Sequence, residues 1–255
     1  MTHKKVSVVI PLYNSVPFID KTLEAVFQST YPDFEVVLVD DGSTDNTREV
    51  LEKNGWMEKV KYIYQENSGI SSARNTGILA SAGYYVSLLD HDDLPLPEKL
   101  NVLAHYLQKH PEFSMVYTSV IMEGEHADIR KPSNERWVLR YEGDLFESLF
   151  YRKNIAPSST LFIRQSIIDA GLFDKTYKIG EDREFLLRYS LKYLIGYIDR
   201  PLTKYSWRFN NTSVRWKNII PDYEIKMFRQ YKDELIGRSK HGRKIYNKSM
   251  ANGKF

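Results

Sequence analysis

The 255-residue chain contains no cysteine, so disulfide bonds and thiolate metal sites are excluded. No apolar run approaches the roughly 18 residues of a membrane-spanning helix. The N-terminal residues 1–5 lead directly into a strand-like segment, without the pattern of a signal peptide. A cytoplasmic protein is therefore the simplest expectation.

Glycine is absent before Gly42. A dehydrogenase needs a glycine-rich turn after its first strand, where the dinucleotide pyrophosphate binds. A sugar nucleotidyltransferase would likewise need a glycine-rich loop there, and residues 11–14 read Pro-Leu-Tyr-Asn. The missing glycines argue against both of these α/β enzyme classes.

Charge is spread unevenly along the chain, whose net charge is +3. Residues 226–255 hold nine Lys/Arg against Asp233 and Glu234, a net charge of +7, which leaves −4 on the first 225 residues. A basic tail on an acidic body predicts contact with an anionic partner. It argues against a nucleic-acid-binding body.

Hydrophobic residues make up 42% of the chain and charged residues 27%, which is typical of a globular protein with a core. The first 110 residues alternate β-rich runs with helical segments, and this alternation predicts a layered α/β fold with a mostly parallel central sheet flanked by helices. We expect strands at 6–10, 35–39, 60–64 and 84–89, and helices that start at Pro17, after a cap at Ser43 or Thr44, and after a cap at Ser71 or Ser72.

The second half of the chain is less regular. Strands are expected at 115–121, 159–163 and 196–198, a helix at 181–193, and an irregular loop from Glu123 to Glu142. We find no internal repeat and no composition typical of a linker. The sequence therefore predicts one domain over residues 1–220, with a basic helical extension over 221–255.

An acidic cluster follows the fourth expected strand, where Asp90-His91-Asp92-Asp93 places three carboxylates within four residues. These carboxylates repel one another unless a cation offsets their charge. Mg²⁺ and Mn²⁺ prefer oxygen ligands and bridge carboxylates to phosphates. The alternative is a solvated acidic turn that precedes a helix.

Three further segments carry candidate functional groups. Asp40 and Asp41 close the second expected strand, and ligands of open α/β sheets bind at the carboxyl ends of strands. Asn67 and Arg74 flank a helix start suited to phosphate. Glu181-Asp182 opens another helix and could supply a general base. Each segment also has a simpler interpretation, as a turn, a surface arginine or acids favoured by the helix dipole.

These features, in this order and spacing, resemble glycosyltransferase family 2, whose members have the GT-A fold. The similarity extends from residue 5 to about 215. The matching stretches are Val6–Asn14, Glu35–Thr47, Asn67–Gly77, Leu88–Asp93, Gly171–Asp174 and Gly180–Phe185.

The resemblance implies a donor site for a nucleoside-diphosphate sugar, with a uridine diphosphate donor favoured. Its implied nucleoside-lining residues are Pro11, Tyr13 and Asp41, with Asp40 close by. Asn67 and Arg74 are also assigned to the donor, Arg74 towards the diphosphate or the uracil.

The resemblance further implies a metal-assisted reaction with Mn²⁺ or Mg²⁺. Asp90 and Asp92 form a D-x-D pair, in which Asp92 holds the metal and Asp90 faces the ribose. Many members add a histidine near the end of the domain, but this chain has Asn210 there, which is a weaker metal ligand. Asp182 would be the base, supported by Glu181, and one displacement would invert the anomeric carbon.

The implied acceptor is a hydroxyl of a cell-surface glycan or of a lipid-linked saccharide. A non-catalytic carbohydrate- or nucleotide-sugar-binding protein on a degenerate transferase fold is the alternative. In the tail, Phe228, Tyr231 and Leu235 share one helical face. That face could lie on an anionic membrane surface, at the inner side of the membrane, or dock on the domain or in the interface of a homo-oligomer.

Overall fold

The computed structural model describes residues 4–124, 139–150, 155–206 and 220–252. Its main sheet has seven strands in the order β3-β2-β1-β4-β8-β6-β9, and only β8 among them runs antiparallel to its neighbours. The strands of this sheet are β1 (Val6–Leu12), β2 (Phe34–Asp41), β3 (Lys61–Gln65), β4 (Tyr85–Leu88), β6 (Phe113–Thr118), β8 (Thr160–Ile163) and β9 (Leu194–Ile198). A smaller sheet pairs β5 (Leu94–Pro95), β10 (Thr203–Ser206) and β7 (Ile121–Glu123).

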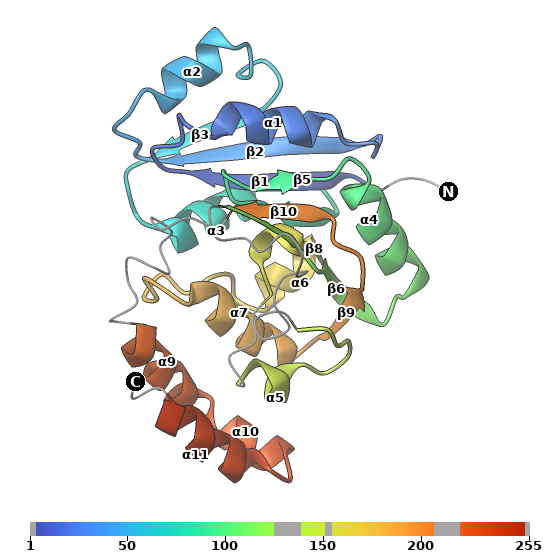
Figure 1. Ribbon diagram of the computed structural model, residues 1–255, viewed down its shortest axis with the longest axis vertical. Helices are drawn as coiled ribbons and strands as arrows, with labels where there is room; N and C mark the ends of the chain where they lie inside the picture. Colours follow the sequence, from blue (N-terminus) through green and yellow to red (C-terminus); the bar gives the residue numbers. More distant parts are fainter. Residues whose placement is uncertain (1–3, 125–138, 151–154, 207–219, 253–255) are drawn as a thin grey trace.

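Helices cover both faces of the main sheet, as Figure 1 shows. Val36 and Leu38 of β2 pack in one hydrophobic cluster with residues of α1, α2 and α4, whereas Val37 and Val39 pack in a second cluster with residues of α3, α6 and α7. The helices before the tail are α1 (Ile19–Phe27), α2 (Thr47–Lys53), α3 (Ile70–Ala80), α4 (Lys99–Lys109), α5 (Phe146–Leu149), α6 (Arg164–Asp169) and α7 (Glu181–Ser190), with a 3₁₀ turn at Pro157–Ser159. The predicted α/β architecture is confirmed.

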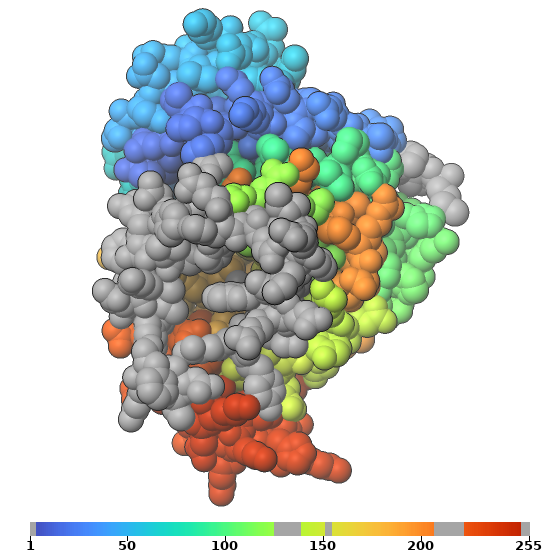
Figure 2. Space-filling view, viewed as in Figure 1, coloured from blue at the N-terminus to red at the C-terminus, as the bar shows by residue number. Residues whose placement is uncertain are grey.

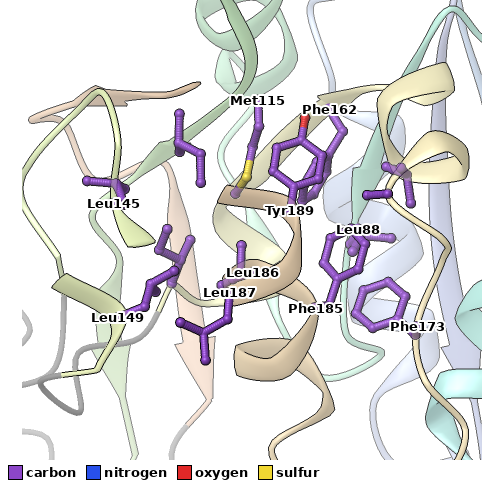
Figure 3. Close-up of a cluster of buried hydrophobic side chains, with 14 of the residues drawn as sticks. Leu88, Met115, Leu145, Leu149, Phe162, Phe173, Phe185, Leu186, Leu187 and Tyr189 are labelled. Atoms are coloured by element: carbon purple, nitrogen blue, oxygen red, sulfur yellow. The ribbon is translucent and has the colours of Figure 1, made fainter. Parts of the chain in front are cut away.

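Helix α7 lies deep in the second cluster (Figure 3). Phe185, Leu186, Leu187 and Tyr189 are all buried, and the ring of Phe185 stacks on Phe173 with 4.4 Å between centroids. Glu181, Arg183 and Glu184 of the same helix are also buried, and each is paired with an opposite charge. Its packing therefore fixes where the first turn of α7 lies relative to the sheet.

The tail forms three helices, α9 (Ile220–Gln230), α10 (Lys232–Arg238) and α11 (Gly242–Asn252), at the opposite end of the molecule from α2 (Figures 1 and 2). Five of its apolar residues are buried, namely Met227, Phe228, Tyr231, Leu235 and Ile245. Phe228 stacks on Phe150 at 5.1 Å, and the Tyr231 hydroxyl donates to Glu184 at 2.6 Å. The proposed membrane-binding face is therefore turned into the protein. None of the described helices is long and apolar enough to cross a membrane.

Two predicted helix caps are wrong. Helix α2 follows Asn46, and α3 follows Gly69, whose φ of +87° suits glycine. Neither Ser43 nor Thr44 caps α2, because their side chains bond to the loop after β1. The strand expected at 115–121 is also interrupted, since β6 ends at Thr118 and β7 starts at Ile121. Most of the loop expected at 123–142 lies outside the described residues.

Candidate active site

The two acids at the end of β2 are both buried, and they serve different partners. Asp40 is 2% exposed and accepts hydrogen bonds from the Ser43 amide at 2.8 Å and the Tyr62 hydroxyl at 2.7 Å. Asp41 is 4% exposed and binds the amides of Ser68 at 2.9 Å and Gly69 at 2.8 Å. Alternation along the strand explains why adjacent carboxylates point to opposite sides.

The loop that precedes α3 is held against Asp41. The Asn67 side chain donates to the Asp41 carbonyl at 2.9 Å. Gly42 makes this approach possible, because a Cβ at this position would lie 2.7 Å from the backbone nitrogen of Asn67. The φ of Gly42 is +73°, which also suits glycine. The structure thus brings together Asp41 and Asn67, two of the residues assigned to the donor.

Pro11 and Tyr13 differ in accessibility. Pro11 is buried in β1 and pairs in register with Val39 of β2. Tyr13 comes directly after the strand and is 47% exposed. Its ring is therefore available to a ligand at the carboxyl edge of the sheet, where open α/β sheets bind nucleotides.

Arg74 is the buried centre of the site, with 2% of its surface exposed. Its Nη1 donates to Glu181 Oε1 at 2.8 Å and its Nη2 to Asp90 Oδ1 at 2.9 Å. Burial disfavours the charged guanidinium, but Asp90 and Glu181 outweigh this effect and raise the pKa of Arg74. Both terminal nitrogens thus hold carboxylates, and a contact from Arg74 to a diphosphate stays a prediction.

The D-x-D loop is fixed by hydrogen bonds from three separate segments. These bonds run from the Asp90 amide to Ser158 Oγ at 3.0 Å, from Thr22 Oγ1 to the His91 carbonyl at 2.7 Å, and from Ser206 Oγ to the Asp92 carbonyl at 2.7 Å. Because its backbone is held by protein groups, the loop presents the side chains of Asp90 and Asp92 in a fixed arrangement.

The third acid of this cluster points inward. Asp93 is 1% exposed and accepts from the Ser206 amide at 2.8 Å. Burial and the charges of Asp90 and Asp92 raise its pKa well above the usual range. Lys99 is also buried, donates to the Ser158 carbonyl at 2.6 Å, and has its pKa lowered to about 7 by burial. These two groups are part of the interior beneath the loop.

Asp90 and Asp92, the two acids of the cluster other than the buried Asp93, fit a metal ion that is shared with a phosphate ligand. Among the described residues, no group of three or more His, Asp or Glu side chains could hold a metal ion. Asp90 and Asp92 are partly exposed, and protein sites for Mg²⁺ commonly use one or two carboxylates together with substrate phosphates. Asn210, the third predicted ligand, lies outside the described residues.

Helix α7 opens with the candidate base. Gly180 precedes it with a φ of +73°. Glu181 is buried, and burial together with the Asp182 charge raises its pKa to about 7, against the opposing effect of Arg74. Asp182 is partly exposed. The structure therefore joins the predicted Glu181-Asp182 pair to the D-x-D pair through Arg74.

Tyr205 of β10 is a site residue that we did not predict. It precedes Ser206, whose amide and hydroxyl bond to Asp93 and to the Asp92 carbonyl, and burial, together with the charges of Asp90 and Asp93, raises the pKa of the Tyr205 hydroxyl. The short strand that carries it was not expected either. The only signal in the sequence was its place just before the segment that would supply the third metal ligand.

Comparison with known proteins decides the family. Residues 7–172 match the model of "Glycosyl transferase family 2". The chain belongs to glycosyltransferase family 2. It is 30% identical over 209 residues to an uncharacterized glycosyltransferase of Rickettsia bellii, which covers 82% of this chain and 30% of that protein. It is 27% identical over 229 residues to the glycosyltransferase GlyA of Streptococcus pneumoniae, covering 83% and 32% respectively. This family 2 chain thus spans about a third of the length of these relatives.

Solved structures show the same fold. Residues 1–349 of Staphylococcus aureus TarS, in complex with UDP-GlcNAc, superpose with a TM-score of 0.74 at 21% identity, over 98% of this chain and 72% of that one. The mannosyltransferase PcManGT of Pyrobaculum calidifontis, in complex with GDP-Man and Mn²⁺, superposes with a TM-score of 0.67 at 18% identity. The match covers 99% of this chain and 73% of that one. These likenesses confirm the predicted GT-A fold.

Proposed function

We propose that this family 2 chain transfers a sugar from a nucleoside-diphosphate sugar to an acceptor hydroxyl. The contact that carries the proposal is the bridge from Arg74 to both Asp90 and Glu181. It places the D-x-D acids, assigned to the donor, beside the helix that carries Asp182. The donor complexes of TarS and PcManGT support a nucleotide-sugar donor for this fold.

The donor would bind across the loops that follow β1, β2 and β3. The exposed Tyr13 ring offers an apolar face to a base. Asp41 Oδ2 accepts one bond from Gly69, and a carboxylate oxygen has room for a second donor such as a base N–H. We favour uridine diphosphate as the leaving group.

Asp92, with Asp90, would hold Mn²⁺ or Mg²⁺. Bound there, the metal would offset the charge that develops on the departing diphosphate. Asp182 would take the proton of the acceptor hydroxyl as that oxygen attacks the anomeric carbon. One displacement from the opposite face inverts that carbon, and no covalent enzyme intermediate is required.

The acceptor would be a hydroxyl of a cell-surface glycan or a lipid-linked saccharide. A peripheral membrane location would then depend on charge alone, since the apolar face of the tail is buried. Within the described part of the tail, the exposed basic residues are Lys226, Arg229, Lys232, Arg238, Lys240, Arg243, Lys244 and Lys248. Charge-driven binding to anionic vesicles would disappear at high salt and in a Lys240→Glu/Arg243→Glu/Lys244→Glu variant. Equal pelleting of that variant would remove the membrane role.

A thermal-shift screen of nucleotide-sugars with Mn²⁺ tests the donor, because a ligand that binds the native state raises Tm by mass action. The donor found should be turned over with an inverted anomeric centre, read by NMR of the product linkage. Asp92→Asn should abolish metal-dependent turnover, whereas Asp199→Asn, at an exposed residue directly after β9, should not. Binding without turnover would favour the non-catalytic sugar-binding alternative, and retention would remove the role of Asp182 as a simple base.

A further inference from the structure

Asn14 has a backbone conformation that few side chains adopt. It lies in the loop between β1 and α1, and its φ is +52°. Left-handed conformations are costly for most L-residues, and asparagine is among those that adopt them most readily. Such outliers persist where surrounding contacts hold them in place, often at functional sites.

The contacts that hold Asn14 come from the loop between β2 and α2. Its Oδ1 accepts hydrogen bonds from the Thr44 amide at 2.8 Å, the Asp45 amide at 3.2 Å and the Thr44 hydroxyl at 3.3 Å. Its own amide donates to Ser43 Oγ at 3.0 Å. A single side chain thus satisfies two consecutive backbone amides of the neighbouring loop.

The next two residues extend this link. The Ser15 amide donates to Thr47 Oγ1 at 2.8 Å, and the Val16 amide donates to Asp45 Oδ2 at 3.3 Å. Three consecutive amides of one loop are therefore satisfied by side chains of the other loop and of Thr47, the first residue of α2. This pairing also explains why Ser43 does not cap α2.

The linked loops carry groups assigned to the nucleotide. Tyr13 immediately precedes Asn14, and Asp41 ends β2 just before the second loop. The Asp41 carboxylate in turn binds the amides of Ser68 and Gly69 in the third loop. The three loops thus form one hydrogen-bonded platform without any ligand contact, and a platform already in its binding geometry has less order to gain when the ligand binds.

We propose that Asn14 is a positioning residue for the nucleoside diphosphate portion of the donor, an inference that rests on the proposed function. Asn14 contributes through its side-chain oxygen, which holds Tyr13 and Asp41 in one fixed arrangement. A role confined to folding would instead lower Tm in its variants without a separate effect on nucleotide affinity.

Two substitutions distinguish the role of the Asn14 side-chain oxygen from the role of its backbone conformation. Asn14→Gly keeps the left-handed conformation and removes the acceptor. Asn14→Asp keeps an acceptor oxygen and tolerates the same conformation. The Kd of UDP with Mn²⁺, measured by calorimetry, should rise roughly tenfold in Asn14→Gly, the equivalent of one or two lost hydrogen bonds. In Asn14→Asp it should stay within about threefold of wild type at an ionic strength that screens the added charge.

Kinetics and folding provide the remaining readouts. In Asn14→Gly, the donor KM should rise with the Kd, while kcat at saturating donor stays within about twofold of wild type. UDP affinity equal to wild type in Asn14→Gly would overturn the inference and leave the proposed function intact. If wild type itself binds no nucleoside diphosphate, the proposed function fails and this inference with it. If Asn14→Gly does not fold, Thr44→Val decides, because it removes the hydroxyl that donates to Asn14 Oδ1: weaker UDP binding supports the inference, and unchanged binding overturns it.

Discussion

Arg74 donates to Glu181 across 2.8 Å, and this buried ion pair joins helix α3 to helix α7. The other arm of the same guanidinium holds Asp90. An arginine presents its donors in a rigid fork, so it fixes the angle between two carboxylates as well as their separation. The two halves of the proposed active site are therefore coupled through one side chain.

Removing this coupling should destabilise the protein. Arg74→Met leaves two carboxylates without their buried partner, and we expect a loss of about 3–5 kcal/mol in the free energy of unfolding. Arg48→Met removes an exposed pair with Glu52 and should change stability little. Urea denaturation of both variants measures the difference. Similar losses would mean that the Arg74 bridge is not a buried ion pair of this kind.

Lys99 should give the stability a specific pH dependence. Because its pKa falls from 10.5 to about 7 on folding, the native state binds fewer protons than the unfolded state between these values. Above about pH 10.5 Lys99 is neutral in both states and its burial costs no charge, whereas the free energy of unfolding falls as the pH drops towards 7. Lys99→Met should remove this pH dependence, so the stability of wild type relative to the variant should rise from pH 7 to pH 10. A constant difference over that range would contradict the assignment.

The tail should be needed for stability. Phe228 is fully buried against Phe150, and Phe228→Ala should cost about 3–5 kcal/mol. Leu79→Ala, at a side chain that is 54% exposed, serves as the control and should cost far less. Denaturant midpoints compare the two. Equal midpoints would indicate that the tail does not pack as described, and would restore its apolar face as a membrane candidate.

Periodicity and strand ends account for what could be predicted. Apolar runs that end in acids gave β2 and β4, and the rule that ligands bind at the carboxyl edge gave Asp41 and Asp90 as candidates. The order of the motifs then gave the family and the GT-A fold. Local patterns fix these features, so a single sequence displays them.

Long-range pairing accounts for what was missed. Ser43 reads as a helix cap because its preference for that position is local, but its hydroxyl is bound by Asn14 from another loop. Lys99 was not among the candidate residues, although it lies under the D-x-D loop and bonds to the Ser158 carbonyl. Tyr205 is brought to the site by a strand of only four residues. None of these partners is encoded by spacing along the chain.

The proposed chemistry depends most directly on Asp182. The decisive measurement is the transfer rate of Asp182→Asn at saturating donor, together with its Kd for UDP and Mn²⁺. Loss of a positioned base should lower the rate on the order of 10²–10⁴-fold, and the Kd should stay at the wild-type value. A wild-type rate, or a donor affinity that falls along with the rate, would contradict the role of Asp182 as the base of a family 2 transferase.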